Sequence, residues 1–230
     1  MHFHIFCSSD TSQELLRKEF SENVWFYKIN GSVVTDMPSP ASWILFEDTG
    51  NSDLINFFKQ RVDTGPLFSF RVLDSRIELK LYSPVRREFV PFPLDIFKGF
   101  AQLGVQKKLL RDRKKVLVVD DEPDLVELLS AFLHDHGFQI YTSTMGAEAL
   151  KLIVQEEVGV VILDIFMPDL LGPEVEFLLS RLFTVNMPKV LFMSGYTSSD
   201  QMATIPLGSS PISKPFQFKE LLERVKILQN

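Results

Sequence analysis

Five side chains with chemical potential stand at or near the ends of apolar runs in the second half of the chain: Asp120, Asp121, Asp164, Ser194 and Lys214. Carboxylates can hold a divalent cation, and Mg²⁺ prefers oxygen ligands. A carboxylate can also act as a covalent nucleophile that accepts a phosphoryl group. Hydroxyl and ammonium groups stabilise the charge on the transferring oxygens. The set therefore predicts a site where Mg²⁺ assists phosphoryl transfer to an aspartate.

The apolar runs that precede these side chains are typical of buried parallel strands. They cover residues 116–119, 160–163 and 190–193, and central parallel strands, buried on both faces, are continuously apolar. Ligands of open α/β sheets bind just outside the carboxyl ends of the strands. We therefore expect the acidic and hydroxyl groups to meet at one edge of a sheet.

Amphipathic segments alternate with the apolar runs across residues 116–230. Apolar residues recur at helical spacing over 125–133, 150–154, 175–182 and 218–228. This alternation predicts an α/β fold with a five-stranded, doubly wound parallel sheet. We expect the fourth helix, around 198–203, to be short or partly unwound. Pro211 should weaken the start of the fifth strand, because proline lacks a ladder donor.

The motifs in this half resemble those of the response regulator receiver domain of two-component signalling. They are Val118-Val119-Asp120-Asp121-Glu122-Pro123, Asp164 with Met167-Pro168, Ser194-Gly195-Tyr196 and Lys214-Pro215-Phe216. The resemblance covers essentially the whole second half and implies a flavodoxin-like receiver fold.

The resemblance also assigns roles to residues. It implies that Asp164 is the phosphoacceptor and that Ser194 and Lys214 stabilise the phosphoryl group. It implies a cis peptide bond before Pro215. The Mg²⁺ ligands that it implies are Asp120, Asp121, Asp164 and the backbone carbonyl of Phe166. The implied phosphoryl donor is a histidine kinase or a phosphotransfer protein.

One position departs from the family pattern. Receivers commonly carry Tyr or Phe three residues before the lysine, and its rotation reports phosphorylation; here Pro211 stands at that position. Tyr196 could take a related role or could be an ordinary exposed tyrosine. The departure predicts a nonstandard signalling surface.

A change in charge separates the two halves. Residues 1–115 hold 17 Lys and Arg against 14 Asp and Glu, a balance of +3, and residues 116–230 hold 7 against 16, a balance of −9. The run 107–115 has six bases in nine residues. Such a run can mark a nucleic-acid or membrane patch, but without interleaved aromatics we interpret it as a solvated linker or the exposed end of a connecting helix. The predicted domains are 1–106, the linker 107–115 and the receiver domain 116–230.

The first half is rich in phenylalanine, with 13 of the 21 in the chain. Strands are predicted at 3–7, 24–29, 43–46, 68–73 and 77–81, and helices at 12–20, 53–61 and 94–103. These indicate a second α/β or α+β domain. It could be a degenerate receiver, with Ser9-Asp10 and Glu47-Asp48 at strand ends and Val90 in place of the lysine. The alternative is an unrelated α/β or α+β output or dimerisation domain.

Composition and the remaining motifs limit the function classes. No apolar run approaches the roughly 20 residues of a membrane-spanning helix, no signal peptide is expected, and Cys7 has no partner for a disulfide or a zinc site. His2 and His4 alternate on one strand, where ordinary strand residues are the simpler interpretation than a metal site. These features predict a cytoplasmic protein.

The sequence contains no helix-turn-helix signature, no cyclic-dinucleotide catalytic motif, no kinase nucleotide-binding motif and no phosphorylatable-histidine box. The predicted function is therefore that of a phosphoprotein and response regulator, not an enzyme, which acts through an unidentified protein target and could form a homodimer. The alternative is a constitutive scaffolding or binding protein with an uncoupled receiver fold.

Overall fold

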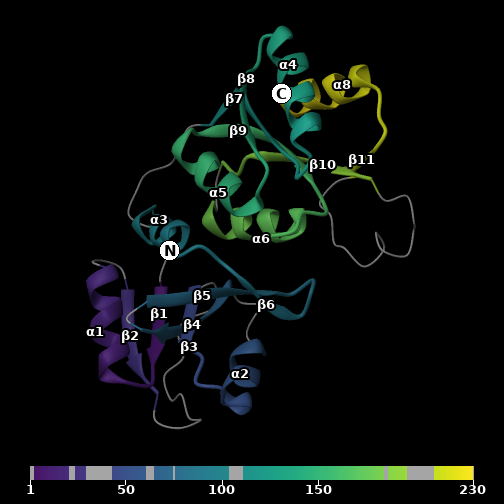
Figure 1. Cartoon of the computed structure of the whole chain (residues 1–230). Coiled ribbons are helices and arrows are strands. Elements are labelled where there is room, and N and C mark those ends of the chain that lie inside the picture. The colour runs from purple at the N-terminus through teal and green to yellow at the C-terminus, as the bar shows by residue number, and fades with distance from the viewer. Residues whose placement is uncertain are drawn as a thin grey trace. The chain divides into compact units, whose positions relative to one another are not determined.

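The computed structural model describes residues 3–20, 24–29, 43–60, 65–74, 76–103, 111–183, 186–195 and 210–229. The chain divides into two compact units, Met1–Lys107 and Lys108–Asn230, each of which contains its own sheet (Figure 1). No helix in the described part of the chain is long and apolar enough to cross a membrane.

The second unit is built on a five-stranded parallel sheet with the order β11-β10-β9-β7-β8. Its strands are β7 (Asp112–Val119), β8 (Gln139–Ser143), β9 (Val158–Asp164), β10 (Lys189–Ser194) and β11 (Ile212–Ser213). Every residue of β9 is buried, as its central place in the sheet requires. The predicted doubly wound parallel sheet is thereby confirmed.

Four described helices cover the two faces of this sheet: α4 (Pro123–Asp135), α5 (Gly146–Gln155), α6 (Gly172–Leu182) and α8 (Phe218–Gln229). Helices α4 and α8 lie on one face, and α5 and α6 lie on the other (Figure 1). On the first face, Leu129 and Val225 pack into one core with the alternate strand residues Val116, Val118 and Ile162. The strand pleat sends successive side chains to opposite faces, so a continuous apolar run supplies both cores.

One boundary in this unit differs from the prediction, and the fifth strand is short. Strand β7 begins at Asp112, so residues 112–115, assigned to the linker, belong to the sheet. Strand β11 has only two residues and begins directly after Pro211, consistent with the missing donor of proline. The predicted helix around 198–203, and Tyr196, lie outside the described residues.

Three half-buried bases of the run 107–115 donate to carbonyls at the carboxyl-terminal ends of helices. Arg111 Nη1 donates to the Ile153 carbonyl in the last turn of α5 at 2.7 Å. Lys115 Nζ donates to the Glu156 carbonyl at the end of the same helix at 2.9 Å, and Arg113 donates to Leu228 of α8 at 3.0 Å. Cations stabilise the free carbonyls and the negative dipole end of a helix. The interpretation of the whole run as a solvated linker is therefore wrong for these three residues.

Arg111 is the most enclosed of the three. Its guanidinium also donates to the carbonyls of Val158 and Asn186 and stacks over the Phe183 ring, 4.0 Å from the centroid. Burial lowers the pKa of Arg111 to about 10, which leaves the side chain charged at neutral pH. The charge thus holds the start of β7 to α5 and to the segment after α6.

The first unit contains a six-stranded sheet with the order β2-β1-β3-β4-β5-β6. Its strands are β1 (Phe3–Cys7), β2 (Val24–Lys28), β3 (Trp43–Glu47), β4 (Leu67–Leu73), β5 (Arg76–Ser83) and β6 (Glu88–Pro91), and its helices are α1 (Asp10–Glu19), α2 (Ser52–Lys59) and α3 (Leu94–Leu103). All of the predicted strands and helices are present. Sequence analysis missed β6, a short strand with one buried residue, Val90.

Aromatic rings fill both faces of this sheet. Phe3 packs against Trp43 and against Phe97 of α3 on one face, and Phe6 packs against Phe58 of α2 on the other. The phenylalanines counted in the sequence are thus largely core residues. His4 is buried as well, and its Nδ1 lies 2.9 Å from the Tyr27 hydroxyl; His2 lies outside the described residues.

The two sheets share part of their strand order. The parallel strands β2-β1-β3-β4 of the first unit follow the same sequence-to-space order as β8-β7-β9-β10 of the second. The first unit then departs, because β5 runs antiparallel to both β4 and β6. The shared order favours a degenerate receiver and the antiparallel strand favours another α/β fold, so both interpretations of the first half stay predictions.

Candidate functional site

The predicted site residues lie at the carboxyl edge of the parallel sheet in the second unit. Asp120 directly follows β7, and Asp164 and Ser194 are the last residues of β9 and β10. The strand register pairs Asp164 with Met193, next to Ser194, and pairs Ser194 with Ser213, next to Lys214. Parallel pairing of neighbouring strands therefore gathers side chains that are up to 94 residues apart in the sequence.

Lys214 is the centre of the cluster. Its Nζ lies 2.6 Å from Asp120 Oδ2 and 2.9 Å from Asp164 Oδ1. A longer contact of 3.5 Å joins it to Glu122 Oε1. Asp120 and Asp164 are both buried, whereas Glu122 is exposed. One ammonium group thus bridges two buried carboxylates.

The charge in this cluster is out of balance. Burial raises the pKa of the Asp120 carboxyl, and the hydrogen bond to Lys214 offsets this only in part. Burial likewise raises the pKa of Asp164, and the charge of Asp120 adds to the effect. Burial also lowers the pKa of Lys214, but its hydrogen bonds to Asp120 and Asp164 outweigh burial, and the net pKa is raised. One cation cannot neutralise two buried carboxylates, so the site favours further positive charge.

The two carboxylate oxygens of Asp120 have different surroundings. Its Oδ1 accepts a hydrogen bond from the Glu122 amide at 3.2 Å. Its Oδ2 is buried and accepts no well-aligned hydrogen bond, so the Lys214 contact is its only compensation among the described residues. A buried carboxylate oxygen with a single ionic contact is costly to maintain. It is also a suitable ligand for a metal ion.

The side chain of Asp121 takes a different position from its neighbour. It is exposed, and none of the hydrogen bonds or ion pairs found among the described residues joins it to the Lys214 cluster. Within the same residues, no group of three acidic, His or Cys side chains is close enough to hold a metal ion without other donors. The role of Asp121 as a ligand stays a prediction.

The donor set nevertheless fits Mg²⁺. This ion is usually held by one or two carboxylates together with phosphate oxygens and water, and Asp120 and Asp164 provide two. The Phe166 amide donates to Asp164 Oδ2 at 2.8 Å, so the loop that carries the Phe166 carbonyl turns back over the phosphoacceptor candidate. The unbalanced negative charge of the cluster and the poorly hydrogen-bonded Oδ2 of Asp120 both favour a divalent cation.

Ser194 and Pro215 take the positions that the sequence predicted. Ser194 is buried at the end of β10, and its backbone carbonyl accepts a hydrogen bond from the Lys214 amide at 2.6 Å. The Lys214–Pro215 peptide bond is cis, as the resemblance implied. The main chain of Lys214 is thus fixed to the strand that ends at Ser194, which positions its side chain.

Sequence analysis missed two acidic residues near the site, Asp169 and Glu174. The Asp169 carboxylate accepts hydrogen bonds from the amides of Gly146 and Ala147. Glu174 is buried, and its Oε2 accepts from the Leu171 amide at 2.8 Å. Both carboxylates hold the loop between Asp164 and α6. Glu174 is the third residue of α6, a position from which a glutamate commonly caps a helix. The contact of Asp169 with another helix has no local signal.

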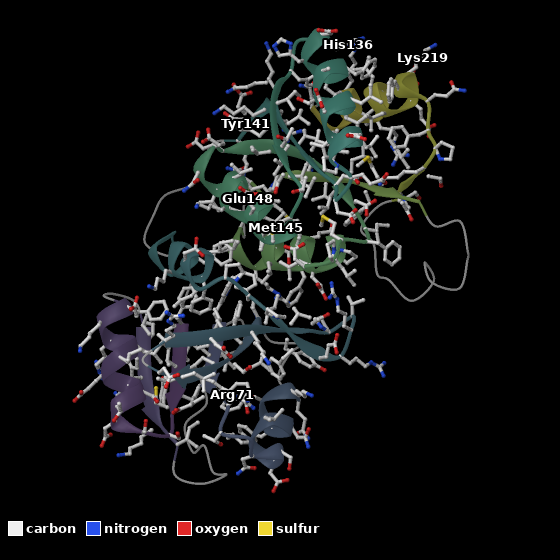
Figure 2. The ribbon with its side chains drawn as sticks, viewed as in Figure 1. Arg71, His136, Tyr141, Met145, Glu148 and Lys219 are labelled. Carbon is white, nitrogen blue, oxygen red and sulfur yellow. The ribbon has the colours of Figure 1, made fainter. Side chains whose placement is uncertain are left out.

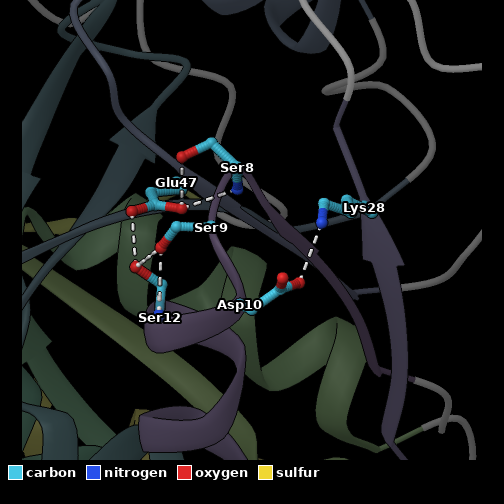
Figure 3. Close-up of polar contacts among 6 residues, drawn as sticks. All are labelled: Ser8, Ser9, Asp10, Ser12, Lys28 and Glu47. Carbon is cyan, nitrogen blue, oxygen red and sulfur yellow. Dashed lines mark hydrogen bonds and ion pairs between the residues drawn. The ribbon is translucent and has the colours of Figure 1, made fainter.

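The carboxyl edge of the first sheet has a different composition. Glu47, the last residue of β3, accepts hydrogen bonds from the Ser8 amide at 2.6 Å, the Ser8 hydroxyl at 2.7 Å and the Ser12 hydroxyl at 2.6 Å (Figure 3). Asp10 pairs with Lys28 at 2.9 Å. No described lysine or arginine pairs with Glu47, and Val90 is buried in β6. Neutral donors thus satisfy the carboxylate at this edge.

Comparisons with known proteins agree with the geometry of the second unit. The family model described as response regulator receiver domain matches residues 116–226.

Three receiver structures each match about half of this chain. That of a response regulator from Bermanella marisrubri is 29% identical, with 51% of this chain and 98% of that chain covered and a TM-score of 0.45. The Francisella response regulator 1452 receiver domain is 28% identical, with 50% and 95% covered and a TM-score of 0.43. The beryllofluoride-activated NtrC4 receiver domain dimer is 32% identical, with 50% and 95% covered and a TM-score of 0.43.

The family match thus coincides with the unit that holds the parallel sheet and the Lys214 cluster. Residues 116–226 of this chain are a response regulator receiver domain.

Proposed function

We propose that this chain is a two-component response regulator that accepts a phosphoryl group on Asp164. The observation that carries the proposal is the bridge from Lys214 to the buried carboxylates of Asp120 and Asp164. In the transfer, an Asp164 oxygen forms the new bond to phosphorus as the bond from phosphorus to a donor histidine nitrogen breaks. The donor is a histidine kinase or a phosphotransfer protein, the class that the receiver family implies.

Each residue of the cluster has a distinct task in this proposal. Asp164 is the nucleophile, because it ends the central strand and its Oδ1 faces the ammonium group. Lys214 binds the phosphoryl oxygens and neutralises their charge, the main requirement of phosphoryl transfer. The Ser194 hydroxyl hydrogen-bonds one of these oxygens from the adjacent strand end.

Mg²⁺ would be held by Asp120, Asp164 and the Phe166 carbonyl, with Asp121 as the predicted additional ligand. When bound, the ion supplies positive charge to the carboxylates and to the phosphoryl oxygens. The chain acts in this proposal as a phosphoryl acceptor, not as an enzyme for an external substrate. Its output passes to a protein target.

The test is phosphorylation from acetyl phosphate with Mg²⁺, followed by intact mass. The wild-type chain should gain the mass of one phosphoryl group, and Asp164→Asn should gain none, because an amide is not a nucleophile here. Glu47→Gln is the matched control: it makes the same carboxylate-to-amide change at a strand end of the first unit, and it should be phosphorylated like the wild type. Modification that persists in Asp164→Asn would refute the assignment.

A constitutive scaffold is the second candidate, and the short strand β11 after Pro211 is the observation that favours it. Without the usual aromatic residue at this position, the site could be uncoupled from the partner surface. Beryllofluoride with Mg²⁺ distinguishes the candidates. A regulator should change its amide exchange in β11 and α8, its oligomeric state by sedimentation, or its binding of a captured partner. A scaffold should bind that partner with all of these unchanged.

A further inference from the structure

We propose that Asp169 is a positioning residue for the phosphoryl-accepting site, because it anchors the loop that carries the Phe166 carbonyl to the start of α5. The inference rests on the proposed function, since it concerns the metal affinity of the same site. The hydrogen bonds of Asp169 that carry the inference are those to the Gly146 and Ala147 amides. Asp169 acts through the loop.

The anchor is a bidentate contact between a carboxylate and a helix start. Asp169 Oδ1 accepts from the Gly146 amide at 3.0 Å, and Oδ2 accepts from the Ala147 amide at 2.9 Å. These amides open α5, whose own N-cap, Met145, provides no side-chain acceptor. The positive dipole end of a helix favours an anion. Asp169 therefore supplies from another loop the cap that α5 lacks.

The loop between β9 and α6 is held at both ends. At its start, the Phe166 amide donates to Asp164 Oδ2. At its end, the Gly172 amide donates to the Ile165 carbonyl at 2.9 Å, which closes the loop on itself. A Cβ on Gly172 would lie 2.5 Å from the Asp164 carbonyl oxygen, so only glycine permits this closure. A displacement of the middle of this short closed loop should therefore change the positions of Phe166 and Asp164.

Packing adds a second contact at the anchor. Gly146 faces Leu170, which is buried beside Asp169, and a Cβ built on Gly146 would lie 3.0 Å from Leu170 Cβ and 3.1 Å from its carbonyl oxygen. The loop and the helix start thus approach each other as closely as the backbone allows. The hydrogen bonds of Asp169 and the packing of Leu170 therefore restrain the same segment, and both involve Gly146.

The functional consequence concerns the affinity for Mg²⁺. A carbonyl that is already in place can ligate the ion without a loss of loop freedom, and groups that orient metal ligands commonly contribute to affinity. Coupling of this kind is reciprocal. If the Asp169 anchor promotes binding of the ion, then the bound ion must strengthen the hydrogen bonds to Gly146 and Ala147.

The first experiment titrates Mg²⁺ into the wild-type chain and Asp169→Asn by calorimetry, since both tryptophans, Trp25 and Trp43, lie in the first unit and would report poorly. The variant leaves one acceptor and turns an amide group toward the other donor. We expect its dissociation constant to rise about 3- to 10-fold, near the lower limit for outer-shell partners of metal ligands. The phosphorylation rate at saturating Mg²⁺ should stay within about twofold of the wild type.

Two further variants distinguish the loss of the loop anchor from the loss of a negative charge. Glu148→Gln removes the same charge from an exposed position in the first turn of α5 (Figure 2) and should leave Mg²⁺ affinity within about twofold. Gly146→Ala keeps all charges, but its Cβ would lie 3.0 Å from both Leu170 Cβ and Val175 Cγ2, so these neighbours must move by a few tenths of an ångström. It should weaken Mg²⁺ binding in the same direction as Asp169→Asn.

The second experiment needs no variant. Amide hydrogen exchange at Gly146 and Ala147 of the wild-type chain should slow when Mg²⁺ is added, whereas a purely structural cap would show no response. Equal Mg²⁺ affinity in the wild type and Asp169→Asn, or unchanged exchange at these amides, would overturn the positioning role. If the wild type itself binds no Mg²⁺, the proposed function fails and this inference fails with it.

Discussion

The carboxyl edges of the two sheets differ in the groups that compensate their buried or half-buried carboxylates. In the receiver unit, Asp120 and Asp164 share one ammonium group, and Asp120 keeps a buried oxygen without a well-aligned hydrogen bond. In the first unit, Glu47 receives three short hydrogen bonds from Ser8 and Ser12. The strand order around the two edges is the same over four strands.

A position at the carboxyl edge of a sheet therefore does not by itself make a functional site. The edge with excess negative charge favours a cation, which in turn can bind a phosphoryl group. Without the cation, that excess charge costs stability. At the edge of the first sheet, neutral donors already hydrogen-bond the Glu47 carboxylate, which favours stability over the binding of a cation. Substitutions at the receiver edge should therefore alter function, and substitutions at the edge of the first sheet should alter stability.

The largest effect is expected from Lys214→Ala. The variant removes the only cation of the cluster, and loss of one preorganised charge partner of a reacting group typically lowers rates by about 10²–10³-fold. Phosphorylation of Asp164 by acetyl phosphate, followed by intact mass over time, should slow by this order. The matched control is Lys219→Ala, an exposed lysine in the first turn of α8 (Figure 2). If the two variants were equally fast, the bridge of Lys214 would have no part in transfer.

The opposite edge should respond in stability alone. Glu47→Ala leaves the Ser8 amide, the Ser8 hydroxyl and the buried Ser12 hydroxyl without their acceptor, which should cost the first unit about 1–3 kcal/mol. Denaturant unfolding followed by tryptophan fluorescence measures this, because Trp25 and Trp43 both report that unit. Glu14→Ala, at an exposed position of α1, should change the unfolding free energy by less than about 0.5 kcal/mol. Reduced phosphorylation of Asp164 in Glu47→Ala would contradict the independence of the two edges.

The sequence predicted much of the receiver edge, because its strands are continuous apolar runs and each functional residue follows one. Local patterns predicted neither the capping of α5 by Asp169 nor the hydrogen bonds of Glu47, because both depend on contacts between segments that are distant in the sequence. Strand β6 was missed because it is short and mostly exposed. Arg111, Arg113 and Lys115 were interpreted as solvated because a charge pattern carries no information about which carbonyls lie nearby.

Arg111 extends the comparison to the other end of the receiver sheet, away from the cluster. Arg111→Met should destabilise the receiver unit by about 1–2 kcal/mol, since it removes hydrogen bonds to carbonyls but also a desolvated charge. Lys114→Met, at an exposed position in the same basic run, is the control and should have little effect. Calorimetric unfolding measures both. Phosphorylation of the folded Arg111→Met chain should equal that of the wild type, whereas a large loss would connect this end of the sheet to the site.

The smallest effect is expected from pH in the absence of Mg²⁺. Burial raises the pKa of Asp120 and of Asp164 in the folded chain, so the folded state binds these protons more tightly than the unfolded state does. Their favourable contribution is present below the ordinary Asp range and is lost as pH rises through the raised pKa values. The asparagine side chain of Asp120→Asn cannot ionise, so the variant should lose less unfolding free energy than the wild type as pH rises. The difference in unfolding free energy, variant minus wild type, should therefore grow as pH rises through this window.

Asp124→Asn, an exposed change in the first turn of α4, provides the baseline for this pH series. The raised pKa of Lys214 does not confuse the result, because its contribution is lost only as pH rises above the ordinary Lys range. Saturating Mg²⁺ should reduce the advantage of Asp120→Asn, since the ion compensates the wild-type carboxylates and has lost a ligand in the variant. An advantage that shrinks with rising pH would mean that Lys214 outweighs burial, and the receiver edge would then be as well satisfied as that of Glu47.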